Sequence, residues 1–319
     1  MAQFEIKDGV AIIPDGTTEI GWCDFHECTS LESITIPESV TKIGDWAFYG
    51  CTSLESIVVA DGNPVYDSRE GCNAIIETAT NTLIKGCKTT VIPNSVKAIG
   101  YGAFEGCTSL KSITIPKSVK KIEEGTFKGC TSLESIVVAD GNPVYDSREG
   151  CNAIIETTTN TLIQGCKTTV IPKSVTKIGE EAFSGCTSLK SITVPESVTT
   201  IGEYAFYRCT SLKSITIPES VTYIGESAFE DCTSLESITI PKLVKVIECG
   251  AFSGCTSLKS ITIPESVTKI GSEAFYDCTS LVTINVPAKK TDYYKECLSE
   301  DWHDKIVELA PEKKTKTKK

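Results

Sequence analysis

A unit of 23 residues recurs along almost the whole chain, and this repeat restricts the fold more than any other feature. One copy runs from Leu31 to Cys51 and reads LESITIPESVTKIGDWAFYGC. The apolar residues that end the strand-like part of successive copies are Ile13, Ile36, Val59, Ile92, Ile115, Val138, Ile171, Val194, Ile217, Ile240, Ile263 and Val286. Neighbours in this series lie 23 residues apart nine times and 33 residues apart twice. Because the register never slips, the units must stack as one regular array in which each contacts only its neighbours.

The apolar spacing inside the unit predicts a short strand with one buried face. Leu31, Ile34 and Ile36 give the pattern L-x-x-I-x-I. Side chains alternate along a strand, so Ile34 and Ile36 share one face and the intervening Thr35 lies on the other. A period of 23 lies within the roughly 20–29 residues of leucine-rich repeats. We therefore predict a repeat solenoid, a right-handed coil with a parallel concave β-sheet of about twelve rungs.

Most of the 16 cysteines occupy one column of the repeat. They are Cys28, Cys51, Cys107, Cys130, Cys186, Cys209, Cys232, Cys255 and Cys278. This regular placement predicts an interior stack of small apolar side chains beside the phenylalanine column. The chain has no C-x₂-C pair and no Cys/His cluster, so the sequence predicts no metal site. Disulfides inside the stack are not expected, because parallel Cβ vectors suit the bond geometry badly.

Two units are ten residues longer than the others and carry an inserted segment. In the first, the apolar runs 74–76 and 83–84 flank a polar turn, which predicts a β-hairpin. The second is almost identical, with Thr158 and Gln164 as its only differences between Asp140 and Cys166. We call these units the long rungs, and they span about residues 60–92 and 139–171.

The predicted hairpins place pairs of cysteines on neighbouring strands. A turn at Ala79 and Thr80 sets Cys72 opposite Cys87, and the same register sets Cys151 opposite Cys166. Two interpretations stay open for each pair, namely thiols packed side by side or a cross-strand disulfide formed in an oxidising compartment. The long rungs lack the Ala-Phe-x-x-Cys closure, so the hairpins must leave the regular cross-section or replace that closure, and we expect both to project from the same side of the coil. Tyr66 and Tyr145 are expected to pack under them.

The ends of the array depart from the repeat and predict caps. A helix is expected to begin at Thr291 or Asp292 and to end at Cys297, with residues 305–309 lying across the last rung. Repeat arrays need such caps, because an exposed end strand is a template for aggregation. The predicted organisation is a capping rung at residues 1–28, a solenoid at 29–287, a cap at 288–309 and a disordered basic tail at 310–319.

Composition and motifs exclude several classes of function. The formal net charge is −11, whereas nucleic-acid binding needs clustered basic side chains. No apolar run approaches the roughly 20 residues of a membrane span, and residues 1–21 contain no recognisable signal peptide, which alone favours a cytoplasmic chain. Nucleotide, hydrolase, zinc and calcium motifs are absent. The two histidines, His26 and His303, lie near opposite ends of the array. We predict no catalytic residues, no cofactor and no metal.

Two surfaces are candidates for binding a partner. The first is the polar face of the strands, represented by Ser191, Thr193, Ser214 and Thr216. The second is the rim around the phenylalanine column, which carries aromatic residues at matched repeat positions. Trp46 and Tyr204 share one position, while Tyr49, Tyr207 and Tyr276 share another. A solvated sheet face and aromatic packing between rungs are the alternatives.

The repeated units closely resemble the BspA-like leucine-rich-repeat family of bacteria and some protists. The resemblance is carried by the unit I-P-x-S-V-x-x-I-G-x-x-A-F-x-x-C-x-S-L and by the N-P-x-Y-x-S motif of the long rungs, and it covers about residues 10–309. It implies a surface or secreted protein that acts in adhesion or in contact with a host or matrix.

The leading hypothesis is therefore a non-enzymatic interaction or adhesion module with a protein or glycan ligand. The alternatives are a structural scaffold or self-assembling rod, and a regular Ser/Thr lattice that binds a surface or a glycan.

Overall fold

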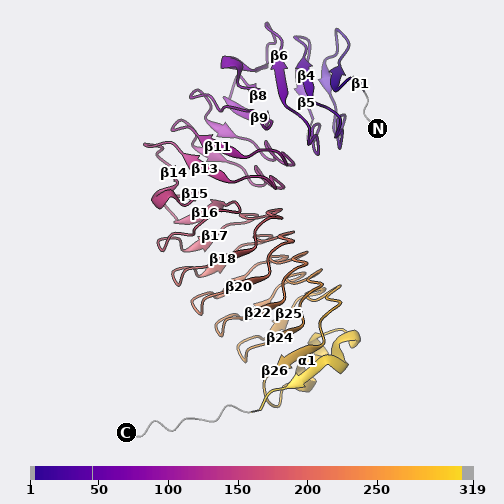
Figure 1. Cartoon of the computed structure of the whole chain (residues 1–319), viewed down its shortest axis with the longest axis vertical. Coiled ribbons are helices and arrows are strands. Elements are labelled where there is room, and N and C mark those ends of the chain that lie inside the picture. The colour runs from indigo at the N-terminus through magenta and orange to yellow at the C-terminus, as the bar shows by residue number, and fades with distance from the viewer. Residues whose placement is uncertain (1–3, 45, 311–319) are drawn as a thin grey trace.

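The computed structural model describes residues 4–44 and 46–310, which form a β-solenoid. Its turns stack one on another, and the stack is bent into an arc with the two ends of the chain at opposite extremes (Figure 1). The predicted solenoid of parallel stacked strands is confirmed. Helix is confined to one α-helix and three short 3₁₀ segments among the described residues.

One column of strands carries the L-x-x-I-x-I pattern, and we call it the long-strand column. Its members are β2 (Val10–Ile12), β4 (Ser33–Ile36), β6 (Ser56–Val59), β11 (Ser112–Ile115), β13 (Ser135–Val138), β18 (Ser191–Thr193), β20 (Ser214–Thr216), β22 (Ser237–Thr239), β24 (Ser260–Thr262) and β26 (Thr283–Val286). Neighbouring strands are parallel and pair at the repeat distance, so that Ser191 pairs with Ser214 and Ile192 with Ile215. The isoleucine is buried, whereas the flanking serine and threonine are exposed, as the alternation predicts.

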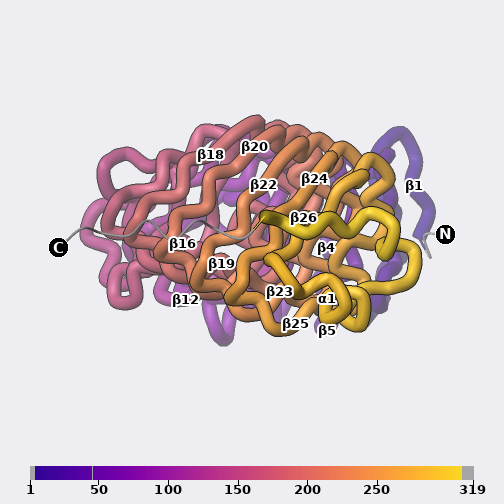
Figure 2. Tube along the Cα trace, turned by 90° about the horizontal axis from the view of Figure 1, so that it is seen from below, coloured from indigo at the N-terminus to yellow at the C-terminus, as the bar shows by residue number. Residues whose placement is uncertain are grey.

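A second column of two-residue strands, the short-strand column, lies across the core. It contains β3 (Glu19–Ile20), β5 (Lys42–Ile43), β10 (Ala98–Ile99), β12 (Lys121–Ile122), β17 (Lys177–Ile178), β19 (Thr200–Ile201), β21 (Tyr223–Ile224), β23 (Val246–Ile247) and β25 (Lys269–Ile270). Figure 2 shows β18 to β26 along one side of the coil and β19, β23 and β25 along the other. In an ordinary rung, a corner loop with the pattern Gly-x-x-Ala-Phe follows the short strand, as at Gly202–Phe206.

The corner loops supply two interior columns, which the sequence predicts. Consecutive phenylalanine rings stack nearly parallel, as Phe183 and Phe206 do with centroids 5.1 Å apart. Each following cysteine lies beside this column and donates its S–H to a carbonyl of the preceding rung; Cys209 Sγ lies 3.2 Å from the oxygen of Phe183. The predicted stack is confirmed for Cys51, Cys107, Cys130, Cys186, Cys209, Cys232, Cys255 and Cys278, all of which are buried, while Cys28 is half-buried.

The long rungs are built from short strands that run across the coil. The first contains β7 (Tyr66–Asp67), the 3₁₀ segment η1 (Arg69–Gly71), β8 (Ala74–Glu77) and β9 (Thr82–Gly86). The second contains β14 (Tyr145–Asp146), η2 (Arg148–Gly150), β15 (Ile154–Glu156) and β16 (Thr161–Gln164). In each, the hairpin strands are antiparallel, and the second strand joins the short-strand column through β10 or β17. The predicted hairpins are present, and Tyr66 and Tyr145 are buried.

The hairpins do not project from the coil, so that prediction is wrong. Ala74, Ile75 and Ile76 of β8 are fully buried, because the hairpin replaces the missing corner loop and crosses the interior. One face of β8 joins the middle hydrophobic cluster through Ala74 and Ile76, and the other joins the N-terminal cluster through Ile75. The hairpins therefore divide the core into three clusters, and β15 repeats the arrangement between the middle and C-terminal clusters.

The predicted pairing of the hairpin cysteines is also wrong. Near the turn Ile76 pairs with Leu83, as predicted, but a bulge then shifts the register so that Ile75 pairs with Lys85. The shift takes Cys72 out of register with Cys87, and the two side chains join different clusters. Cys151 and Cys166 repeat this separation, and all four are free thiols. A disulfide across either hairpin would require the bulge to be removed.

The long rungs also interrupt the long-strand sheet. Ten of the twelve predicted rungs carry a strand in this column, whereas the segments that end at Ile92 and Ile171 do not. The described strands consequently form separate sheets, with β2–β4–β6, β11–β13 and β18–β20–β22–β24–β26 as the successive stretches of the column.

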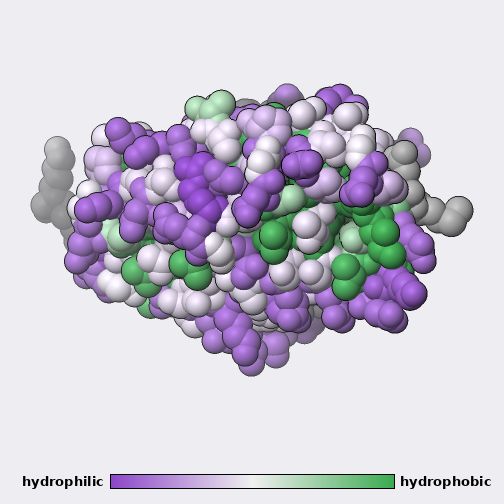
Figure 3. Space-filling view, turned by 90° about the horizontal axis from the view of Figure 1, so that it is seen from above, coloured by the Kyte–Doolittle hydropathy of each residue, from purple (hydrophilic) through white to green (hydrophobic). Residues whose placement is uncertain are grey.

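Both ends of the described chain carry additional elements. At the N-terminal end β1 (Glu5–Lys7) pairs antiparallel with β2, whose Val10 and Ile12 are exposed. Seen from above, apolar side chains gather in patches among polar ones (Figure 3). At the C-terminal end α1 (Thr291–Cys297) and the 3₁₀ segment η3 (Glu300–Lys305) precede β27 (Ile306–Glu308), which pairs with β26. The helix has the predicted bounds. Most of the predicted basic tail, residues 311–319, lies outside the described residues.

Candidate functional site

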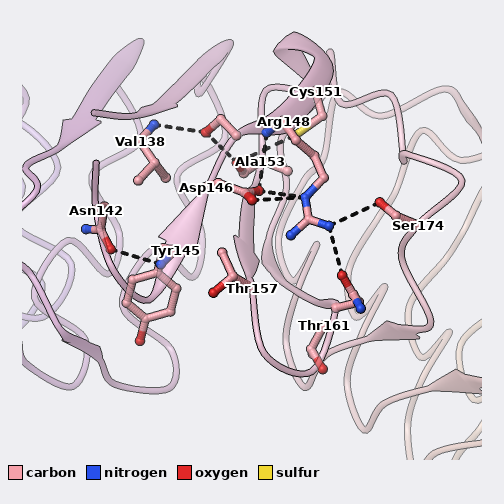
Figure 4. Close-up of polar contacts among 12 residues, drawn as sticks. Val138, Asn142, Tyr145, Asp146, Arg148, Cys151, Ala153, Thr157, Thr161 and Ser174 are labelled. Carbon is pink, nitrogen blue, oxygen red and sulfur yellow. Dashed lines mark hydrogen bonds and ion pairs between the residues drawn. The ribbon is translucent and has the colours of Figure 1, made fainter. Parts of the chain in front are cut away.

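The polar side chains of the N-P-x-Y-x-S motif in the long rungs form hydrogen bonds with the backbone of the same chain. In the second long rung the amide of Asn142 donates to the carbonyls of Pro116 and Val119, both at 2.9 Å, and its oxygen accepts from the Tyr145 backbone N–H (Figure 4). Ser147 accepts from the Val138 N–H at 2.9 Å. These bonds join the long rung to its predecessor, so the motif is not a site for an external ligand.

An arginine completes the same network. Arg148 donates to both oxygens of Asp146 and reaches Asn160 at 2.8 Å and Ser174 at 3.3 Å (Figure 4). The first long rung repeats the pattern with Arg69, Asp67 and Asn81. Since these polar side chains have partners within the chain, they hold the hairpins in place.

The first predicted binding surface, the exposed side of the long-strand column, is polar and uniform. Ser191, Thr193, Ser214 and Thr216 are all exposed on it. Its exposed apolar side chains include Val10 and Ile12 of β2 and, beside the long rungs, Val58, Val91, Val137 and Val170, which stand in place of threonine. Binding hot spots are usually buried aromatic or arginine anchors, and this face offers none among its described residues.

The second predicted surface, the rim, places its aromatic residues in two groups. Toward the C-terminal end, Tyr204 and Tyr207 are half-buried and meet edge to face with centroids 5.9 Å apart. Arg208 lies over the Tyr207 ring at 5.0 Å, so these tyrosines pack within the rim. Tyr276 is 65% exposed and isolated from them.

The N-terminal part of the rim has exposed aromatic residues, of which the sequence analysis found only two. Trp46 is 48% exposed and Tyr49 is also exposed. Trp22 lies 6.0 Å from Trp46 between ring centroids, and His26 stacks on Tyr49 at 4.9 Å. Tyr101, on the far side of the first long rung, is 56% exposed. Trp22 and Tyr101 share a third repeat position, three residues before Phe25 and Phe104, which the sequence analysis did not use.

A small cleft lies between these aromatic residues, and we call it the first rim cleft. It exists because Ile84 and Lys85 lead directly into Gly86, so the first long rung has no full corner loop to fill the rim. Trp46 and Tyr49 lie on one side and Tyr101 and Glu105 on the other, where the end of the Tyr101 ring lies beside Gly125 of the following rung, and the volume is 190 Å³. Burial raises the pKa of the Glu105 carboxyl, and nearby Lys128 and Lys85 oppose the shift.

The second long rung produces a matching cleft of 250 Å³, the second rim cleft. Its floor contains Gln164, and its walls contain Gly125 and Glu181. Lys128 pairs with Glu181 at 2.6 Å and thereby joins the two loops on either side of the long rung. Neighbouring carboxylates and burial raise the pKa of Glu180, with burial the larger cause.

Within residues 4–44 and 46–310, no three or more His, Cys, Asp and Glu side chains are grouped so that they could hold a metal ion. The described part of the chain contains no helix with the length and apolar character needed to cross a membrane.

Comparison with known proteins gives a consistent result. The BspA type leucine rich repeat region, in six copies, matches residues 9–69, 76–151, 160–282 and 228–315. No curated protein matches the chain. A leucine rich cell surface protein from Faecalibacterium prausnitzii is 30% identical, with 87% of this chain and 85% of that one covered and a TM-score of 0.61.

Two further solved structures are similar. A leucine-rich repeat protein from Eubacterium ventriosum is 26% identical, with 86% of this chain and 73% of that one covered and a TM-score of 0.65. The pneumococcal vaccine antigen PcpA is 24% identical, with 86% and 62% covered and a TM-score of 0.56, and it shows a similarity of fold alone.

Proposed function

Because the chain belongs to the family of BspA-type leucine-rich-repeat proteins, we propose that it is a non-enzymatic module that binds a protein or glycan partner at a bacterial cell surface or after secretion. The similarity to a leucine rich cell surface protein of F. prausnitzii supports this location. The resemblance stated from the sequence points to the same role in adhesion.

The exposed aromatic residues on the N-terminal part of the rim carry the proposal. Trp22, Trp46, Tyr49 and Tyr101 surround or adjoin the first rim cleft and remain exposed in the folded chain. Tryptophan and tyrosine supply large contact areas with a polar end, and they are enriched among residues that dominate binding energies. We therefore place the partner-binding surface here, and the Ser/Thr side of the long-strand column becomes the secondary candidate.

A binding role also agrees with how the chain uses its reactive side chains. The buried cysteines bond to carbonyls of the preceding rung, as Cys130 does with Phe104 at 3.2 Å. The polar residues of the long rungs bond to the backbone or to each other. These groups stabilise the array and leave the rim and the strand face to make external contacts.

The two alternatives receive less support. A self-assembling rod is favoured by an open end, whereas β27 covers the C-terminal edge of the sheet beside β26. A flat Ser/Thr lattice is favoured by a straight array, whereas the stack is curved (Figure 1).

A direct test measures binding to immobilised extracellular-matrix proteins and to a glycan array. The rim variant replaces Trp22 and Tyr49 with alanine, and the strand-face variant replaces Ser214 and Thr216 with alanine. Tyr276→Ala is the control, since it removes an exposed tyrosine from the rim position shared with Tyr49, at the other end of the chain. The proposal expects loss of binding in the rim variant alone. Equal binding by all variants, or loss only in the strand-face variant, would place the binding surface elsewhere.

A further inference from the structure

We propose that the first rim cleft binds one neutral pyranose ring of a glycan. The inference rests on the proposed function and deepens it, because it assigns a ligand class to one part of the rim. It starts from the fact that the chain contains two copies of this cleft, in equivalent places 79 residues apart, with different side chains.

The floors of the two clefts differ at one of the only two positions that distinguish the long rungs. In the second cleft the amide of Gln164 donates to the carbonyls of Gly165 and Ala182 at 2.9 and 3.1 Å, which uses both N–H groups. In the first cleft Lys85 is only 8% exposed, and its ammonium group donates to the Glu105 carbonyl at 3.2 Å. Among the described residues its other two N–H groups have no acceptor. A buried donor without a partner is costly, so Lys85 is prepared to donate to a ligand oxygen.

The walls of the two clefts also differ in whether their polar side chains have partners. In the second cleft Lys128 and Glu181 form an ion pair across the opening. Their equivalents in the first cleft are Tyr49 and Gly102, which leave the opening unbridged. Trp46 stands where the second cleft has Gly125. The first cleft therefore has one aromatic wall, formed by Trp46 and Tyr49, and a free donor, whereas the second satisfies its own polar groups.

This combination of groups fits a sugar ring. A pyranose presents an apolar C–H face, which packs on Trp or Tyr, and hydroxyl groups that both donate and accept hydrogen bonds. Lys85 supplies donors, and the half-buried Glu105 carboxyl supplies acceptors. The volume of 190 Å³ lies below the roughly 300–1,000 Å³ of sites for drug-sized ligands, which suits one ring with the remaining glycan outside.

The charges favour a neutral ring over an acidic one. Lys85 and Glu105 carry opposite charges, so the cleft has no net charge of its own. The whole chain carries −11, which repels anionic glycans at long range. A peptide carboxylate could reach Lys85, but it lacks the ring face that the aromatic wall would contact.

The backbone at Trp46 has the conformation of every corner loop. Trp46 has φ +56°, and the same repeat position has a positive φ in other rungs, whether it holds glycine, as at Gly125, or a larger residue, as at Glu181 and Tyr204. Glycine adopts this conformation readily, so Trp46→Gly removes the ring without straining the loop.

The experiment titrates the full-length protein with methyl β-glucoside, methyl β-galactoside and methyl α-mannoside, followed by saturation-transfer NMR and calorimetry. Glucuronate and an acetylated glutamate serve as acidic probes. A ligand of this size is expected to bind at least one neutral glycoside with a dissociation constant on the order of 1 mM. Binding should be confined to the first cleft.

Three variants copy residues that the chain already carries at equivalent positions, so their folding is protected. They are Lys85→Gln, as at Gln164, Trp46→Gly, as at Gly125, and Tyr101→Ser, as at Ser272. Each is expected to weaken binding at least tenfold while thermal unfolding shows a native fold. Tyr276→Ala is the control and should bind like the wild type.

Three outcomes would overturn the inference. They are no binding of any neutral glycoside by the wild type, unchanged binding in all three variants, and tighter binding of glucuronate or acetylated glutamate. The protein could bind no neutral glycoside while the variant with Trp22 and Tyr49 replaced by alanine still loses binding to its macromolecular partner. The rim would then remain the binding surface, and only the assignment of a sugar to the first rim cleft would be wrong.

Discussion

Gly86 shows how a single residue adapts the repeat to a long rung. It occupies the repeat position that holds phenylalanine in ordinary rungs. The hydrogen bonds show this equivalence, since the Gly86 N–H donates to the Ala103 carbonyl at 2.8 Å, just as the Phe183 N–H donates to the Ala205 carbonyl. A side chain there is excluded, since an added Cβ would overlap the ring of Phe104. The ring of the next rung thus fills the space that the missing phenylalanine leaves.

We predict that Gly86→Ala destabilises the protein by about 1–3 kcal/mol, the usual cost of overpacking a core. Its backbone is not left-handed, so the cost comes from the contact with Phe104. The control is Gly141→Ala, where φ is +80° and the surroundings are open, so that only backbone strain of about 1 kcal/mol is expected. Urea unfolding measures both. A Gly86 variant as stable as the wild type would show that Phe104 moves aside freely.

At the scale of elements, a tyrosine hydroxyl helps Asn142 and Ser147 to attach the long rung to the preceding rung. Tyr145 is buried, and its hydroxyl accepts from the Ile122 N–H at 3.1 Å. We predict that Tyr145→Phe costs about 1–3 kcal/mol, because the partly buried N–H loses its partner. Hydrogen exchange at the Ile122 amide should accelerate as well. Tyr276→Phe, on an exposed ring, should change stability by less than about 0.5 kcal/mol. Equal effects of the two substitutions would contradict this role.

The hairpins mark the limit of what the sequence predicts for an element. The apolar runs and the polar turn predicted the two strands and the pairing of Ile76 with Leu83. They did not predict the bulge after Ile75. The unbroken apolar run at 74–76 is typical of a strand buried on both faces and favours one that crosses the core, but the sequence analysis expected a projecting hairpin. A shift of one residue exchanges the faces of a strand, and here it separates Cys72 from Cys87. The register of the hairpin depends on how its strands pack against the hydrophobic clusters on either side.

At the scale of the molecule, the array was predictable and the first rim cleft was not. The register of 23 and 33 residues determines which residues stack, so the phenylalanine and cysteine columns followed from counting. The cleft depends instead on the absence of a corner loop, which brings Trp46 and Tyr101 to opposite walls although they hold different repeat positions. Matched columns relate Trp46 to Tyr204 and Trp22 to Tyr101, but they do not indicate which of these aromatic residues border a cleft.

The C-terminal elements should control association between molecules. β27 pairs with β26, Trp302 meets Phe275 edge to face at 6.4 Å, and Tyr294 is buried with its hydroxyl 3.0 Å from the Val267 carbonyl. We predict that truncation after Pro287 exposes the edge of β26 and the last core ring and causes aggregation. Truncation after Ala310 is the control and should leave the protein monomeric. Light scattering with size-exclusion chromatography measures the result. A monomeric, equally stable product of the first truncation would show that these elements do not act as a cap.

The cysteine stack runs almost the length of the molecule and should make its stability sensitive to alkaline pH. Burial raises the pKa of Cys51, Cys186 and Cys278 to about 12 and also raises the pKa of the other stacked thiols above the ordinary value of 9.0. Below pH 9 the thiols are protonated in both the folded and unfolded states, so they contribute no pH dependence. Above pH 9 they ionise in the unfolded chain first, and the unfolded state is favoured.

The size of the effect follows from the number of thiols. Each fully retained thiol proton should lower the free energy of unfolding by about 1.4 kcal/mol per pH unit above pH 9, and the eight buried members of the stack act together. The sum, roughly 11 kcal/mol per pH unit, is comparable to the roughly 5–15 kcal/mol stability of an ordinary protein. We therefore predict cooperative unfolding of the reduced protein within about one pH unit above pH 9. Urea unfolding between pH 7.5 and 10 measures the slope, and a double variant, Cys130→Ala with Cys255→Ala, should reduce it by about a quarter, because it removes two of eight thiols. If stability stays constant to pH 10, or if the variant keeps the full slope, the stacked thiols do not set the alkaline limit.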